Sequence, residues 1–170
     1  LSIQMPLPHV VAEKVLQYSK EPTSELIKFE FVFSSTYWNT PPHIDILIGN
    51  KVHYSGHLHK NNSTIEFTTR LDFADHSLKV IRTGKTLKES KQVDGEWETQ
   101  SCSLERLTVD GINLRNILWS KSKFVPVYDE TQAGDPVIDG ECIFGFNGTF
   151  NLNFSSPFYQ YVVDCVRGAR

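Results

Sequence analysis

The stretch IEFTTRLDF, residues 65–73, decides the fold class. Its odd positions hold apolar residues or threonine, and its even positions hold polar or charged residues. Successive side chains of a β-strand point to opposite faces of the sheet, so this alternation predicts a strand with one buried and one exposed face.

The same two-residue period extends outward from this stretch in both directions. Gly49-Asn50 and Asp94-Gly95 interrupt it with residues that suit tight β-hairpin turns. Asn147-Gly148 predicts a last hairpin near the C-terminus. Strands are therefore expected at residues 26–34, 44–48, 52–58, 65–73, 77–83, 87–93, 97–102, 104–109, 112–119, 124–128, 142–146 and 149–154.

The C-terminal segment follows a different period. Ser156-Pro157 predicts a helix N-cap followed by proline at the first helical position. Phe158, Tyr161 and Cys165 follow at helical spacing, which predicts a short C-terminal helix.

Many short strands with almost no helix predict an all-β fold, an antiparallel β-sandwich of jelly-roll type with one short C-terminal helix. The chain of 170 residues fits one domain. Residues 1–22 are expected to form an N-terminal arm or lead-in strand, and residues 23–170 the sandwich.

Charge and hydropathy exclude some partners. The net charge of −3 gives no reason to expect nucleic-acid binding. No signal peptide and no apolar run long enough to span a bilayer is visible, so no membrane insertion is expected. The stretch Phe124 to Val166 contains no Lys or Arg, whereas Lys79 to Lys123 is rich in them. This contrast suits head-to-tail contacts between copies of the chain.

No catalytic constellation stands out. The chain lacks GxSxG, HExxH and a glycine-rich phosphate loop, so it is expected not to be an enzyme. No cofactor is expected either, with calcium as the alternative.

Two sets of side chains are candidate metal ligands. His53, His57 and His59 share one face of an unbroken strand, where residues two apart lie close enough to chelate an ion, although a solvent-facing histidine row is the preferred interpretation. The calcium alternative needs several carboxylates converging from a loop. Its candidates are Asp129, Glu130, Asp135 and Asp139.

Aromatic side chains are candidates for stacking on sugar rings, because a flat π face matches the apolar face of a pyranose. Tyr37, Trp38 and Tyr128 lie in or next to loops and are the candidates. Trp97 and Trp119 lie on expected strands and are assigned to the core.

Two stretches resemble known families. FTTRLDFADHSLKVIRTGKT, Phe67 to Thr86, is similar to jelly-roll carbohydrate-binding modules. GFNGTFNLNFSSPFYQYVVD, Gly145 to Asp164, resembles the ending of small β-sandwich virion proteins of tailed phages of marine bacteria and cyanobacteria.

The second resemblance implies a non-enzymatic virion protein, such as a capsid decoration or a tail or adhesion component. Its partners would be other virion proteins and copies of itself, and its location the virion. The first resemblance implies the alternative, an extracellular or virion-borne module that binds a host or environmental glycan. A glycan-cleaving enzyme is the third hypothesis.

Overall fold

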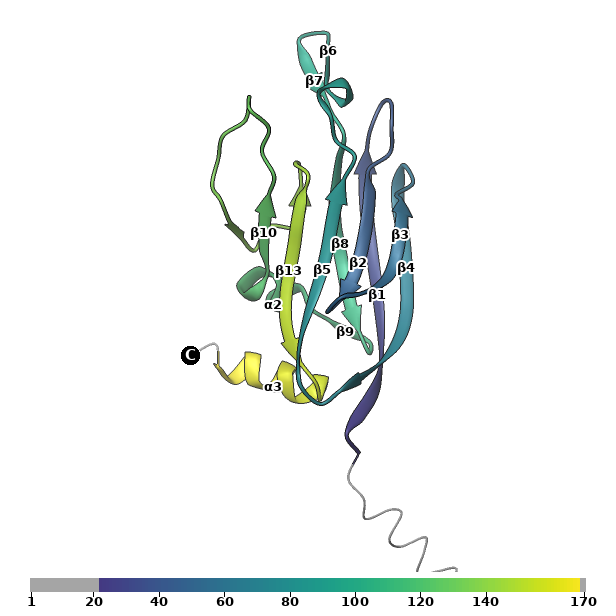
Figure 1. Cartoon of the computed structure of the whole chain (residues 1–170), viewed down its shortest axis with the longest axis vertical. Coiled ribbons are helices and arrows are strands. Elements are labelled where there is room, and N and C mark those ends of the chain that lie inside the picture. The colour runs from purple at the N-terminus through teal and green to yellow at the C-terminus, as the bar shows by residue number, and fades with distance from the viewer. Residues whose placement is uncertain (1–21, 169–170) are drawn as a thin grey trace, which may run out of the picture.

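The computed structural model describes residues 22–168 and shows two antiparallel β-sheets packed face to face (Figure 1). The arm or lead-in strand expected at residues 1–22 lies almost wholly outside the described residues. Within residues 22–168, no helix is long and apolar enough to cross a membrane.

The first sheet, called sheet A, is built around the long central strand β1. Its spatial order is β12 (Ile143–Phe144), β8 (Ser101–Val109), β1 (Ser24–Thr36) and β4 (Asn61–Asp72), with β9 (Ile112–Asn113) paired to β8.

The second sheet, called sheet B, covers the apolar face of sheet A. Its spatial order is β11 (Ile138–Asp139), β10 (Lys123–Pro126), β13 (Gly148–Ser155), β5 (Asp75–Thr83), β2 (His43–Ile48) and β3 (Lys51–His57).

Five further elements lie outside these sheets. The strands β6 (Lys91–Val93) and β7 (Glu96–Glu98) form a separate hairpin, which follows the 3-10 helix η1 (Leu87–Glu89). Two α-helices are α2 (Arg115–Lys121) and α3 (Phe158–Gly168).

The predicted alternation fills the core between the sheets. Ile27, Phe29, Phe31 and Phe33 of β1 are all fully buried, while the residues between them are half-buried or exposed. The inward rows of β2, β5 and β13 face them: Ile44, Ile46, Ile48, Leu78, Val80, Phe150, Leu152 and Phe154. The predicted antiparallel sandwich with a C-terminal helix is therefore confirmed.

Four local predictions are wrong. The segment 112–119 is a two-residue strand followed by α2, so Trp119 lies on a helix and is 78% exposed. Residues 87–93 begin with η1 instead of a strand. Trp97 is 70% exposed, because β7 is a three-residue strand of a hairpin outside the sandwich.

The fourth error concerns the last hairpin. The strands on either side of Asn147 do not pair with each other, because β12 pairs with β8 in sheet A and β13 pairs with β5 and β10 in sheet B. The chain crosses between the sheets at this point. A Cβ on Gly148 would lie 2.5 Å from the backbone oxygen of Val125, so glycine permits the close approach of β10.

The N-terminus of α3 also differs from the expected cap. The helix begins at Phe158, after a cis Ser156–Pro157 peptide bond. The Glu25 carboxylate of β1 accepts hydrogen bonds from the Phe158 N–H, at 2.7 Å, and from the Ser156 hydroxyl. The helix is therefore capped by a residue far away in sequence.

Candidate functional site

The loops at one end of the sandwich contain the aromatic and charged side chains of the candidate site. This end contains the turn after β1, the segment 84–100 with the β6–β7 hairpin, the loop between β10 and β11, and the turn before β13 (Figure 1). Two of the recesses at this end lie along the segment 84–100, one beside Trp97 to Thr99 and one beside Lys85 to Ser90. We call them the aromatic groove and the lysine pocket.

The aromatic groove has a volume of about 420 Å³. Its walls carry three aromatic side chains together with hydroxyl and charged groups: Thr36, Tyr37, Trp38, Lys60, Trp97, Glu98 and Thr99. Trp97 is 70% exposed and Trp38 is 40% exposed. The structure thus brings the predicted stacking residues Tyr37 and Trp38 together with Trp97, which the sequence had placed in the core.

Trp38 is held in a defined orientation. Its indole Nε1 donates a hydrogen bond to the Glu89 carbonyl oxygen at 2.9 Å. The Lys91 ammonium lies 4.5 Å from the centroid of the Trp38 ring, within the range of a cation–π contact. The ring is therefore positioned before any ligand arrives.

The Glu89 carboxylate fixes the rest of the Trp38 loop. Its two oxygens accept hydrogen bonds from Asn39 Nδ2 at 3.2 Å and from the Thr40 backbone N–H at 3.1 Å. Glu89 is only 4% exposed. A buried carboxylate needs such partners, because transfer from water without them carries a large free-energy cost.

The other aromatic residues of the groove are held less tightly. The Lys60 ammonium lies 5.5 Å from the centroid of the Tyr37 ring. Trp97 lies opposite Gln92 in the β6–β7 hairpin, whose ends are joined by an ion pair of 3.7 Å between Lys91 and Glu98.

A fully buried arginine supports the floor between the two recesses. Arg82 follows Leu78 and Val80 in the inward row of β5 and has no exposed surface. It donates hydrogen bonds to Asn147 Oδ1 at 3.0 Å and to the Gln100 carbonyl oxygen at 2.8 Å. Burial lowers the pKa of its guanidinium from the usual value.

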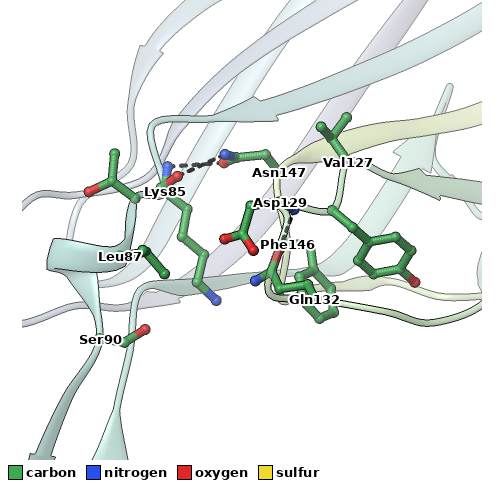
Figure 2. Close-up of a pocket in the computed structure, with 10 residues that line it drawn as sticks. Lys85, Leu87, Ser90, Val127, Asp129, Gln132, Phe146 and Asn147 are labelled. Atoms are coloured by element: carbon green, nitrogen blue, oxygen red, sulfur yellow. Dashed lines mark hydrogen bonds between the residues drawn. The ribbon is translucent and has the colours of Figure 1, made fainter.

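The lysine pocket lies along the segment 84–100, beside Lys85 to Ser90, and has a volume of about 140 Å³. Figure 2 shows Lys85, Asp129 and Gln132 pointing into the space between two loops. The full lining is Lys85, Thr86, Leu87, Ser90, Val127, Tyr128, Asp129, Gln132, Phe146 and Asn147.

Lys85 is the half-buried cation of this pocket. Its ammonium donates a hydrogen bond to the Gly145 carbonyl oxygen and lies 5.5 Å from the centroid of the Phe146 ring. Burial is the main cause that lowers its pKa, and the nearby charge of Arg82 adds to the shift. Asn147 fixes the Lys85 backbone through two hydrogen bonds of 2.9 and 3.0 Å (Figure 2).

Tyr128, the third predicted stacking residue, belongs to the lysine pocket and not to the aromatic groove. Its hydroxyl donates a hydrogen bond to the Asp135 carbonyl oxygen at 2.8 Å. Its ring packs edge-on against Phe146 at 5.1 Å. The predicted set is therefore divided between two recesses.

The predicted calcium ligands do not converge. Asp129 lines the lysine pocket and binds Thr131 through the backbone N–H and the hydroxyl, which lowers the pKa of its carboxyl. Glu130 lies in the adjoining surface recess. Asp139 pairs instead with Lys123 at 2.7 Å across β10 and β11. The prediction that these carboxylates gather is wrong.

The predicted histidine row is also wrong. His53 stacks on Phe67 at 4.6 Å, and β3 ends at His57, before His59. His57 instead packs edge-on against His43 of the neighbouring strand β2, at 5.1 Å. Across residues 22–168, the structure gathers no group of three His, Cys, Asp or Glu side chains that suits a metal ion.

Sequence reasoning missed Trp97, Glu89 and Lys85. A signal for Trp97 was present, because Asp94-Gly95 places it two residues after a tight turn, near the tip of a hairpin. No local signal marked Glu89, because its partners Asn39 and Thr40 are some 50 residues away in the sequence.

No model of a protein family matches the chain, and no curated protein sequence matches it. A solved structure described as "vCBM60 in complex with galactobiose" is similar with a TM-score of 0.49 and 12% sequence identity. The similarity covers 74% of this chain and 98% of that one. The class assigned to this chain, a two-sheet antiparallel sandwich, follows from its own strand pairing.

Proposed function

We propose that this protein is a glycan-binding module that acts without catalysis and uses the aromatic groove to stack a sugar ring. The observation that carries the proposal is the gathering of Tyr37, Trp38 and Trp97 around one groove of about 420 Å³. Such a volume falls in the usual range of small-ligand sites, about 300–1,000 Å³.

The chemistry of the groove matches that of a sugar. A pyranose presents an apolar face of C–H groups, which packs on an aromatic ring, and a rim of hydroxyls that need hydrogen-bond partners. The indoles of Trp38 and Trp97 offer the flat surfaces. Lys60, Glu98 and Thr99 line the same groove and supply donors and acceptors for the hydroxyls.

Pre-organisation favours binding at this groove. The Trp38 loop is tied down at three points by Glu89, through its carbonyl oxygen and its carboxylate. A ligand that stacks on a ring already held in place does not have to order it, so less conformational entropy is lost on binding.

The absence of catalysis is part of the proposal and has its own support. Hydrolysis of a glycosidic bond by the usual mechanism needs two carboxyl groups across the scissile bond, and Glu98 is the one carboxylate among the described residues that line the groove. In the lysine pocket, hydrogen bonds from Thr131 lower the pKa of Asp129. A general acid requires the opposite shift.

The direct test is binding to a glycan array, followed by calorimetry on each positive ligand. The array includes galactobiose, plant and algal polysaccharides and bacterial surface glycans. We expect Trp97→Ala and Trp38→Ala each to weaken affinity by at least about tenfold, which equals about 1.4 kcal/mol. Incubation with the same ligands should release no new reducing ends.

Trp119→Ala is the matched control. This tryptophan is at least as exposed as Trp97 and Trp38, but it lies on α2, outside the aromatic groove. Its replacement should leave glycan affinity unchanged. Binding that survives both groove substitutions, or a complete lack of binding across the array, contradicts the proposal.

A second candidate function is a protein-binding role, as in a virion component. Trp119 and Ile143, which are 78% and 60% exposed, line a recess of about 610 Å³ together with Glu105, Arg106 and Arg115. Exposed aromatic residues with a polar rim are typical of protein interfaces. Mass spectrometry of purified phage particles tests the virion role, since a structural component must co-purify with them.

A further inference from the structure

Strand β4 forms one edge of sheet A and has unusual properties for an edge. It is 12 residues long and pairs with β1 without any shift in register. On its other side, no strand among residues 22–168 pairs with it. The corresponding edge of sheet B is protected differently, because β3 is shorter and its pairing with β2 is interrupted by an irregularity.

The backbone groups that β4 exposes can be identified from its pairing. The Phe73 N–H donates to the Thr23 carbonyl oxygen at 3.0 Å, and the register continues from there with Ser24 opposite Asp72. In an antiparallel pair, alternate residues direct their N–H and C=O groups toward the same neighbour. Odd-numbered residues of β4 therefore bond to β1, and even-numbered residues direct these groups outward.

The β1–β8 pairing supports this assignment independently. The Asp110 N–H donates to the Lys28 carbonyl oxygen at 2.9 Å, so even-numbered residues of β1 face β8 and odd-numbered ones face β4. The register Phe29 opposite Phe67 then places Phe67 toward β1. Outward-directed backbone groups consequently belong to Asn62, Thr64, Glu66, Thr68, Arg70 and Asp72.

We propose that β4 is a dimerisation edge, at which a second copy of the chain pairs antiparallel with its own β4 and Thr68 lies on the two-fold axis. Each outward N–H and C=O group near the centre then has a partner on the other copy. Sheet A becomes continuous across the two copies, as in other cases of β-strand addition.

Charge favours this register over those with the axis at Glu66 or at Arg70. With Thr68 opposite Thr68, Glu66 of each copy faces Arg70 of the other, so two opposite-charge pairs form across the axis. A shift of the axis to position 66 places two Glu66 side chains face to face, and a shift to position 70 does the same to Arg70. Like charges directly opposite each other destabilise a strand pair.

The inward face agrees with the same register. Ile65 lies opposite Leu71 of the other copy, and Phe67 lies opposite Thr69. Phe67 is only half-buried in the single chain, although it stacks on Phe29 at 5.2 Å at the rim of the core. Pairing at this edge covers the exposed part of Phe67 with the partner's side chains.

The proposed dimer has a defined shape. A two-fold axis perpendicular to β4 reverses the strand direction of the second copy, so the two loop ends point in opposite directions. The aromatic grooves then lie at opposite ends of the assembly.

Substitutions at the edge test the proposal by sedimentation velocity and light scattering. The wild type should have twice the mass of the chain. Glu66→Arg and Arg70→Glu should each weaken association by about tenfold or more, because each places like charges opposite one another twice. The double variant restores both pairs and should recover the dimer.

Thr68→Pro provides an independent variant. Proline is tolerated on an edge strand where the N–H faces outward, so the β1–β4 pairing remains intact while the central intermolecular bond is lost. This variant should be monomeric with an unchanged far-UV circular dichroism spectrum. Lys79→Glu, on β5 in the interior of sheet B, reverses a charge away from the β4 edge; this control should remain a dimer.

Three results overturn the proposal: a wild type that is monomeric at its highest soluble concentration, a Thr68→Pro variant that still dimerises, or a double variant as weak as either single one. Loss of the dimer in Trp119→Ala but in none of the edge variants also overturns it, in favour of the recess near α2.

Discussion

Glu89 has an influence on the candidate site that its position on a short 3-10 helix does not suggest. It touches no groove-lining ring through its carboxylate, yet it fixes both residues that follow Trp38 and accepts the indole N–H through its carbonyl. The exposed tryptophans provide the surface for a sugar ring, and Glu89 fixes the orientation of one of them, Trp38.

A conservative substitution tests this role. In Glu89→Gln one carboxylate oxygen is replaced by an NH₂ group. This group faces another donor, either Asn39 Nδ2 or the Thr40 N–H, so one hydrogen bond is lost. Loss of a buried hydrogen bond to a charged acceptor should lower the free energy of unfolding by about 2 kcal/mol, measured by urea denaturation. Glycan affinity should fall as well, through a slower or less complete ordering of the Trp38 loop.

The control for Glu89→Gln is Glu96→Gln. Glu96 is exposed on β7 and does not line the aromatic groove, so its substitution should change stability little. An unfolding free energy of Glu89→Gln equal to that of the wild type would contradict the positioning role.

At the scale of the element, helix α3 depends on a cap supplied by β1. Glu25 accepts the Phe158 N–H at 2.7 Å and the Ser156 hydroxyl, and the negative charge also suits the positive end of the helix dipole. Phe158 then packs edge-on against Phe154 of β13 at 5.9 Å. The helix is thus joined to both sheets.

Glu25→Ala removes this cap. We expect a loss of about 1 kcal/mol in the free energy of unfolding and faster amide hydrogen exchange at residues 158–161, with the exchange of β1 and β13 unchanged. Uniform acceleration across the sandwich would instead show that α3 and the sheets unfold as one unit.

At the scale of the whole molecule, a dimer with two glycan-binding grooves should cross-link polysaccharide chains. Grooves at opposite ends of a dimer engage two separate glycan chains and link them. A wild-type dimer should therefore make a solution of a bound polysaccharide turbid, and monomeric Thr68→Pro should not, although calorimetry gives the same affinity per site.

The turbidity assay separates the two proposals. If Thr68→Pro also produces turbidity, the second contact does not lie at β4. If the wild-type dimer binds the polysaccharide but leaves the solution clear, the grooves do not lie at opposite ends. Failure of binding itself contradicts the glycan proposal and leaves the dimer untouched.

The amino-acid sequence by itself determined the class of fold. The alternation along β1 and β4 and the turns at Gly49-Asn50 and Asp94-Gly95 can be recognised from neighbouring residues alone. A strand buries one face wherever it lies in a sheet, so these patterns do not depend on the rest of the fold. Such patterns predicted most strands of the sandwich and the C-terminal helix. They also singled out Tyr37 and Trp38, since the Pro-Pro loop that follows them marks a break between strands.

Only the tertiary structure decided which residues make the candidate site. Exposure depends on what packs against a side chain, and this is why Trp97 and Trp119 were assigned to the core. The sequence also could not show that Tyr128 lines a different recess from Tyr37 and Trp38. Glu89 and Arg82 each bind residues that are distant in the sequence. The edge at β4 is open because no other described strand pairs with its outer side. Side-chain alternation contains no information about such pairings, because it records which face is buried and not what covers it.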